Sequence, residues 1–260
     1  MQCAVKIPCN GKLVTVEVPT FKMLRDLYAS RLDMDSIMEK LEKLIITPGL
    51  NVIEKFIALL LVRDEYVSSD ISIQGSDKVY NVDVSHIIDA FDEIAERPRY
   101  WYSHHTNYPE DSINAEGILC GVPTSFNNKS LPCIIAVAVK NGPTTQKYTK
   151  SDELHKFLSN MPASLYSVYG TWVTENRNFL EFDIIKHDTV GELTISFADD
   201  SYKLFLQQAF CFIDDSTYRE YVYALTRSLK SPEFIVNSTF IDIADYCRMY
   251  EEESKTQQEA

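Results

Sequence analysis

The segment from Asn51 to Val67 constrains this chain most, because its middle is apolar on most faces of a helix. The run VIEKFIALLLVRDEYV has no polar side wide enough to face water along its whole length. Asn51 and Glu54 predict a capping box, in which two side chains bind the free N–H groups of the first helical turn. Such a helix has to be surrounded by other elements, so we expect it at the centre of an N-terminal core.

A β-hairpin is predicted before this helix. Residues 4–8 and 13–18 alternate between apolar and polar side chains, and Asn10-Gly11 supplies the positive φ angles of a tight turn. Thr20 is placed to cap a following helix that starts at Phe21.

Two more helices and a second hairpin are predicted in the N-terminal region. Ser36 with Glu39 predicts a capping box for a helix that ends at residues 47–49. A second hairpin is expected from ISIQ and KVYNVDV, which flank the turn formers Gly75-Ser76-Asp77. Ser85 is predicted to cap the next helix, and Arg97-Pro98 to end it.

The region 98–197 is predicted to be rich in β-structure. Its first part has few periodic apolar positions and many turn formers. A short helix is expected at 150–161, and strands are expected at 133–139, 164–174, 179–188 and 192–197.

Helical patterns return at the end of the chain, at 199–213, 214–230 and 238–255, the last capped by Ser238 or Thr239. The predicted fold class is therefore α+β, with an N-terminal β-hairpin and helices, a β-rich central region and C-terminal helices. The expected regions are 1–97, 98–197 and 198–260, and the last one is also able to pack with the first.

Composition excludes several classes of function. The net charge is −13 and the pI is about 4.8, which disfavours nucleic acid and anionic membrane surfaces as partners. Only 8 glycines occur, few for a nucleotide-binding fold. No apolar run is long enough for a membrane span, and the N-terminus does not have the pattern of a signal peptide. The six scattered cysteines predict a reduced, cytosolic chain.

A metal site is one hypothesis for the central region. Histidine, cysteine and carboxylate side chains gather there, and these are zinc ligands. The candidates are His104, His105, Asp111, Glu116, Cys120 and Cys133. Their spacing is unlike that of structural zinc sites, so we favour a polar loop and expect neither metal nor cofactor.

A thiol nucleophile is a second hypothesis, with Cys120 as the candidate. Such a thiol needs a nearby base and a lowered pKa. The conceivable bases are His104, His105, His155 and His187. Nothing in the sequence selects one of them, and the alternative is that Cys120 is a small buried apolar residue.

Pairs of carboxylates suggest a hydrolase site, but helix capping is sufficient to explain the pairs in this sequence. Asp199-Asp200 and Asp214-Asp215 each stand directly before a predicted helix, where carboxylates cap the first turn and compensate the helix dipole. Common catalytic sequence motifs are absent. We therefore predict no catalytic residues.

The segment RYWYSHH is the strongest candidate for a partner-binding surface. Arg99, Tyr100, Trp101 and Tyr102 combine arginine with aromatic rings, the residue types on which protein interfaces depend most. The alternative is that Tyr100 and Trp101 are core residues under a loop.

The order of elements resembles that of baseplate hub subunits and hub assembly chaperones of T-even-type, contractile-tailed bacteriophages. The similar stretches are VKIPCNGKLVTVEVPTFKMLRDL, NVIEKFIALLLVRDEYVSSDISI, SFADDSYKLFLQQAF, YREYVYALTRSL and STFIDIADYCRMYEEESK. They cover roughly residues 1–95 and 193–255, and the middle is not matched. Family members commonly start the last helix with a Thr-Pro-Ala-Glu-like sequence, where this chain has Ser238-Thr239-Phe240-Ile241.

The resemblance implies a non-enzymatic protein that binds phage baseplate and tail hub proteins. Such a protein acts in the host cytoplasm during assembly, either as a chaperone or as a hub component retained in the virion. No catalytic residue is carried over. The alternatives are a regulatory adaptor that binds a host or viral protein through residues 99–105, and a thiol or metal enzyme that uses the central loop.

Overall fold

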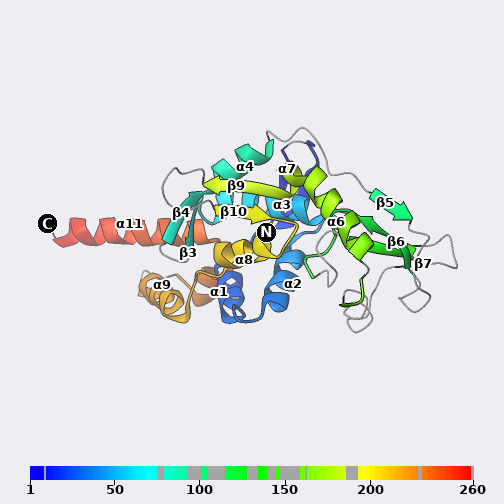
Figure 1. The fold of residues 1–260 in the computed structure, drawn as a ribbon. Helices are drawn as coiled ribbons and strands as arrows, with labels where there is room; N and C mark the ends of the chain where they lie inside the picture. The colour runs from blue at the N-terminus through cyan, green and yellow to red at the C-terminus, as the bar shows by residue number, and fades with distance from the viewer. Residues whose placement is uncertain are drawn as a thin grey trace. The chain divides into compact units, whose positions relative to one another are not determined.

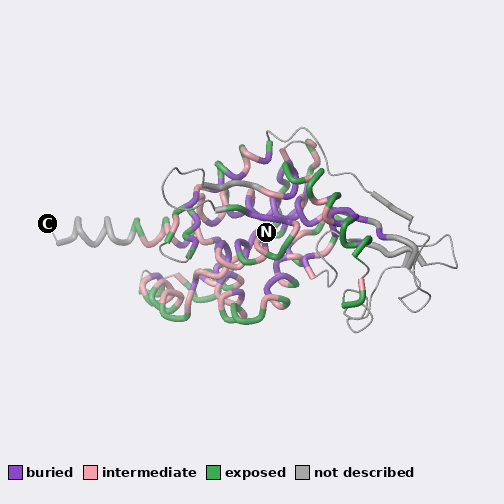
Figure 2. Tube along the Cα trace, viewed as in Figure 1, coloured by how far each residue is buried: buried purple, intermediate pink, exposed green. Residues whose placement is uncertain are grey.

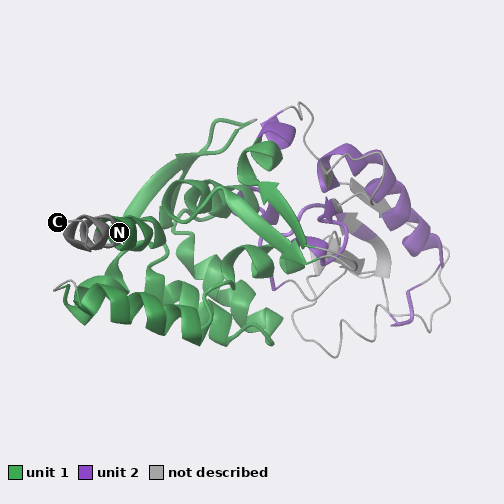
Figure 3. Ribbon diagram, turned by 90° about the vertical axis from the view of Figure 1, so that its left-hand side faces the viewer, with its two compact units in different colours: residues 1–48, 56–88, 203–260 green, residues 49–55, 89–202 purple. Residues whose placement is uncertain are grey.

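Helices and short antiparallel strands share this chain, as Figure 1 shows, and the predicted α+β class is confirmed. The computed structural model describes residues 1–8, 10–74, 79–92, 101–104, 115–127, 134–139, 145–146, 159–161, 163–185, 193–227 and 230–258. The chain divides into two compact units, coloured separately in Figure 3. Residues 1–48, 56–88 and 203–260 form the first, and residues 49–55 and 89–202 form the second. The three regions expected from the sequence stay a prediction.

The first unit opens with the predicted hairpin. Strands β1 (Gln2–Lys6) and β2 (Leu13–Glu17) pair antiparallel. Gly11 has a φ of 67°, which a residue with a Cβ rarely adopts, so the Asn-Gly signal was read correctly. Helix α1 (Phe21–Ala29) follows, and the Thr20 hydroxyl accepts a hydrogen bond from the Met23 N–H at 3.3 Å, as predicted.

Helix α2 (Met34–Leu44) starts earlier than expected, so the predicted Ser36–Glu39 capping box is wrong. The Asp33 carboxylate caps the helix instead, accepting from the Ser36 N–H at 3.1 Å. Asp33 precedes the first turn, which makes the N–H of Ser36 one of the groups that need a cap. The chain after α2 then runs beside β2, where Ile45 bridges Val16.

Helix α3 (Val52–Tyr66) has the buried position that its sequence predicts. Its capping box is present, since the Asn51 side chain accepts from the Glu54 N–H at 2.9 Å and the Glu54 carboxylate accepts from the Asn51 N–H at 3.0 Å. Figure 2 shows the helix buried along most of its length. From Phe56 onward, α3 belongs to the first unit and provides the centre of its core.

The second hairpin is formed by β3 (Asp70–Gln74) and β4 (Val79–Asp83), while its predicted turn lies outside the described residues. Helix α4 (Val84–Asp92) follows directly. Its cap is not Ser85, because the helix begins one residue before it; the Asp83 carboxylate accepts from the Ser85 N–H at 2.8 Å. The predicted helix end at Arg97-Pro98 also lies outside the described residues.

The end of the chain is helical, as expected, with one helix more than the pattern indicated. The four helices are α8 (Ser201–Phe210), α9 (Asp215–Arg227), α10 (Pro232–Asn237) and α11 (Phe240–Gln258). Thr239 and Asp242 cap α11 reciprocally, which selects Thr239 from the two predicted caps. The Phe21 ring of α1 stacks on Tyr218 of α9 at a centroid distance of 4.9 Å, and contacts between α9, α10 and α11 complete this part of the first unit.

The second unit contains a four-stranded antiparallel sheet in the order β5-β6-β7-β8 and a separate β9–β10 hairpin. The strands are β5 (Trp101–His104), β6 (Ala115–Cys120), β7 (Ile134–Val139), β8 (Thr145–Gln146), β9 (Glu181–Ile185) and β10 (Leu193–Ser196). The strands predicted near 133–139, 179–188 and 192–197 are therefore confirmed, with shorter bounds.

The predicted strand at 164–174 is wrong, because these residues lie in helix α6 (Ala163–Glu175), which is followed by α7 (Arg177–Leu180). The four buried side chains of α6 are Leu165, Val168, Tyr169 and Trp172, a helical spacing that packs α6 against β6. Their aromatic and β-branched neighbours favour strands by local propensity, and helical packing overrides that preference. Most of the helix predicted at 150–161 lies outside the described residues.

Candidate binding site

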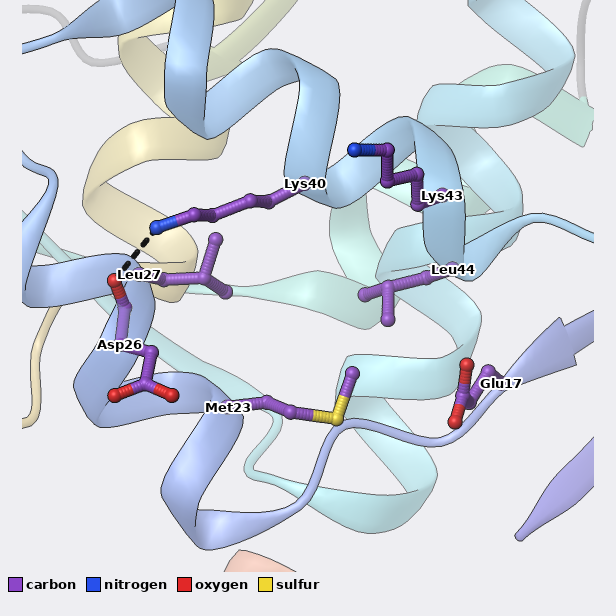
Figure 4. Close-up of a pocket in the computed structure, with 7 residues that line it drawn as sticks. All are labelled: Glu17, Met23, Asp26, Leu27, Lys40, Lys43 and Leu44. Atoms are coloured by element: carbon purple, nitrogen blue, oxygen red, sulfur yellow. Dashed lines mark hydrogen bonds between the residues drawn. The ribbon is translucent and has the colours of Figure 1, made fainter.

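A pocket in the first unit is a candidate binding site among the residues that the structure describes. It has a volume of about 250 Å³ and lies between α1, α2 and the end of β2. Figure 4 shows its lining residues, which are Glu17, Met23, Asp26, Leu27, Lys40, Lys43 and Leu44.

The walls of this α1–α2 pocket are apolar. Leu27 from α1 and Leu44 from α2 point toward each other across it, and the side chain of Met23 extends between β2 and α1 beneath them (Figure 4). Both leucines belong to the inward stripes of their helices and are 3% exposed, while Met23 is half-buried. An apolar side chain entering the pocket would lose contact with water and gain contact with these groups.

Charged groups form the rim, and its two cations already have local partners. The Lys40 ammonium donates to the main-chain oxygen of Asp26 at 3.1 Å and to the hydroxyl of Ser30. The Lys43 ammonium lies 2.6 Å from the Glu39 carboxylate, one helical turn away. These surface contacts lower the pKa of Glu39, chiefly through the hydrogen bond from Lys43. The rim is thus suited to orienting a charged or polar group.

Among the described residues of the first unit, a strongly perturbed cation lies in the interior. Arg63 of α3 is 3% exposed, and burial lowers its pKa to about 10. Its guanidinium donates to the carbonyls of Ala209 and Asp70, each at 2.8 Å, and to that of Ser68. The side chain also lies over the Phe212 ring at 5.6 Å. These contacts join α3 to β3 and to the C-terminal end of α8, so Arg63 stabilises the packing of these elements.

Half of the predicted partner-binding segment is described. Trp101 and Tyr102 lie in β5, where they pair with Cys120 and Leu119 of β6. Arg99 and Tyr100 lie outside the described residues. The role of this segment stays a prediction.

Cys120 is buried in the second unit, as the alternative interpretation of this residue expected. It is 0% exposed, and burial raises the pKa of its thiol to about 12. A nucleophilic cysteine needs a lowered pKa, so this environment protects the thiol instead of activating it. The backbone of His104 pairs with Gly117, three residues along β6 from Cys120, which is about 10 Å in a strand.

The remaining candidates for metal or thiol chemistry are only partly described. Glu116 lies in β6, and the other residues fall outside the described part of the chain: His105, Asp111, Cys133, His155 and His187. Within the described residues, histidine, cysteine and carboxylate side chains do not gather in groups of three that would suit a metal ion.

One carboxylate of each pair binds an N–H at the start of a helix, as predicted. Asp199 accepts a hydrogen bond from the Ser201 N–H at 2.7 Å, at the start of α8. Asp214 accepts from the Thr217 N–H at 2.7 Å, at the start of α9, and this bond is the main reason why its pKa is lowered.

Sequence reasoning missed the α1–α2 pocket. Its residues come from three elements, and each of them fits a local pattern: Leu27 and Leu44 are core positions, and Lys40 and Lys43 are ordinary surface positions of a helix. A local pattern does not indicate that two inward stripes leave space between them. Finding this pocket requires the arrangement of α1 relative to α2, and the sequence alone does not provide that arrangement.

Comparison with known proteins gave no match: no family model, curated protein or solved structure is similar to this chain. Among the described residues, no helix has the length and apolar character that crossing a membrane requires.

Proposed function

We propose that this chain is a non-enzymatic protein that binds other proteins during assembly of a phage tail baseplate hub. The observation that carries the binding part is the α1–α2 pocket, which combines apolar walls with a charged rim. Protein interfaces use the same combination, an apolar anchor surrounded by polar groups. The raised pKa of Cys120 is a second support, because it opposes the thiol-enzyme alternative.

The phage part of the proposal rests on the resemblance of both ends of the chain to hub subunits and hub assembly chaperones. The net charge of −13 fits a partner with a basic surface and disfavours nucleic acid. The proposed partners are baseplate and tail hub proteins, met in the host cytoplasm. A hub component would stay in the virion, whereas a chaperone would leave before the particle is complete.

The test is affinity recovery of the tagged chain from the cells in which it is made, with mass spectrometry of the bound proteins. Recovery of tail or baseplate proteins at a fixed ratio supports assembly. Comparison with purified particles then separates the two roles, because only a hub component is found in them. A bound metal or small molecule in the absence of any protein partner would favour the enzyme alternative.

A further inference from the structure

We infer that the α1–α2 pocket takes one aliphatic side chain from a partner segment that carries lysine or arginine beside it. The inference rests on the proposed function only in taking the occupant to be a protein. It adds the chemistry of the segment that binds.

The size of the pocket favours a side chain over a cofactor. Sites for drug-sized molecules have volumes of roughly 300–1,000 Å³. The volume here is about 250 Å³, and the apolar part is confined to the space between Leu27, Leu44 and Met23. That space suits a group the size of a leucine side chain, which would complete the contacts that the two helices leave open.

The charges at the rim favour a basic neighbour beside that anchor. Lys40 and Lys43 are held by the Asp26 carbonyl and the Glu39 carboxylate, so an acidic ligand would have to compete with existing bonds. Glu17 is exposed at the opposite side of the pocket, at the end of β2 (Figure 4). A cation next to the anchor could reach this carboxylate without displacing a partner from the described residues.

The net charge of the whole chain supports the same choice. At −13, it attracts a basic segment and steers it during encounter. It also repels a second copy of the chain, which makes self-association through this pocket the weaker alternative. A basic segment with a single aliphatic anchor is therefore the occupant that both the pocket and the overall charge favour.

The probe is a synthetic peptide, Lys-Lys-Leu-Lys-Lys with blocked ends, added to the full chain labelled with ¹³C at the methionine methyl groups. Met23 lines the pocket, so its methyl resonance reports on occupancy. The chain has six methionines, and Met23→Leu identifies the Met23 signal. Met249 is exposed and does not line the pocket, so its methyl group serves as an internal control.

We expect the Met23 resonance to shift saturably with this peptide while that of Met249 stays in place. Replacing the central leucine by serine should weaken binding about tenfold, because the apolar side chain supplies most of the affinity. Glu17→Lys should weaken it about threefold, as expected for one surface charge. Glu220→Lys makes the same change at an exposed position of α9 outside the pocket and should leave binding unaltered.

Three results would overturn the inference. They are an unmoved Met23 resonance at millimolar Lys-Lys-Leu-Lys-Lys, equal binding of Glu-Glu-Leu-Glu-Glu, and a Met23 shift that depends on protein concentration alone, which would identify a second copy as the occupant. The proposed function fails separately. If Glu17→Lys binds the recovered tail proteins with the same affinity as the natural chain, this pocket is not their site although assembly stands. If the peptide binds but no tail protein is recovered, the pocket chemistry stands and the phage proposal fails.

Discussion

Arg63 and the lysines of the pocket rim place positive charge in two different settings within the first unit. Arg63 is nearly inaccessible, its pKa is lowered by burial, and three main-chain carbonyls accept its hydrogen bonds. Lys40 and Lys43 stand beside an open pocket; Lys40 donates to the Asp26 carbonyl of α1, and Lys43 pairs with Glu39 one turn away on α2. Perturbed ionisation often marks a functional site, but here it follows from burial and joins elements of the core. The accessible region beside the pocket is the better candidate for binding.

The largest expected effect comes from removing the interior cation. Arg63→Met keeps much of the apolar stem, leaves the buried carbonyl of Ala209 without its donor and removes the part-buried hydrogen bond to the Asp70 carbonyl. We expect the free energy of unfolding to fall by about 3–5 kcal/mol, because buried groups without partners retain their desolvation cost. Denaturant unfolding measures this change.

Two variants sharpen that result. Arg63→Lys should recover only part of the lost stability, since one ammonium cannot reach carbonyls that a planar guanidinium binds together. Arg31→Met removes an exposed arginine whose contact with the Tyr28 carbonyl is 3.3 Å long, and it should have little effect. An Arg63→Met protein as stable as Arg31→Met would show that the buried contacts do not stabilise the unit.

A second prediction concerns a buried titratable group of the second unit, Cys120. Its pKa is raised from an ordinary value of 9.0 to about 12 by burial, so the folded chain holds this proton more tightly than the unfolded chain does. The resulting stability is fully present below pH 9 and is lost as the pH rises from 9 toward 12. In that range, the stability of Cys120→Ala should fall less steeply than that of the natural chain. The two slopes should differ by about 1 kcal/mol per pH unit.

Unfolding curves at several alkaline pH values give the slope of the unfolding free energy against pH for each protein. Other titrating groups are the same in both proteins, so their contributions cancel in the difference. Parallel curves for the two proteins would mean that the Cys120 thiol ionises normally in the folded chain. That result would also reopen the hypothesis that Cys120 is a reactive thiol.

A smaller effect is expected at the start of α3, the same helix that carries Arg63. Asn51→Ala removes the side chain that accepts from the Glu54 N–H, and it should lower stability by about 1 kcal/mol, the usual value of an N-terminal cap. Asn51→Ser is the matched control, because serine also caps helices. A thermal melt in which alanine and serine behave alike would argue against the capping box.

The smallest effect is expected at the pocket rim. Lys43→Gln removes an exposed charge that pairs with Glu39 on the same helix, and exposed pairs contribute little to stability. The melting temperature should therefore stay within experimental error of the natural chain. A clear loss of stability would mean that the rim charges support the fold as Arg63 does, and the contrast between the two regions would disappear.

Much of this fold could be predicted from local sequence signals. The Asn10-Gly11 turn, the cap at Thr20 and the Asn51–Glu54 box each concern atoms within a few residues of one another, so a short stretch of sequence contains the whole interaction. The same holds for Asp214, whose carboxylate binds an N–H three residues away. Burial of α3 was also predictable, because its apolar residues cover most of its surface.

The rest depends on contacts between distant residues. The residue types around Val168 and Trp172 favour a strand by local propensity, whereas packing against β6 makes this segment a helix. Ser85 was taken for a cap although Asp83 stands two residues before it, a choice that only the helix start resolves. The candidate site depends most on such distant contacts, since its pocket exists only where α1 and α2 meet β2.

The central claim is that a protein partner occupies the α1–α2 pocket. The most direct measurement is the methionine methyl spectrum of the labelled chain, alone and in complex with the protein recovered with it from cells. The account predicts that the Met23 resonance shifts in the complex and that Glu17→Lys weakens this complex while Glu220→Lys does not. A stable complex in which the Met23 resonance stays unchanged would contradict it, because the partner would then be held by another surface.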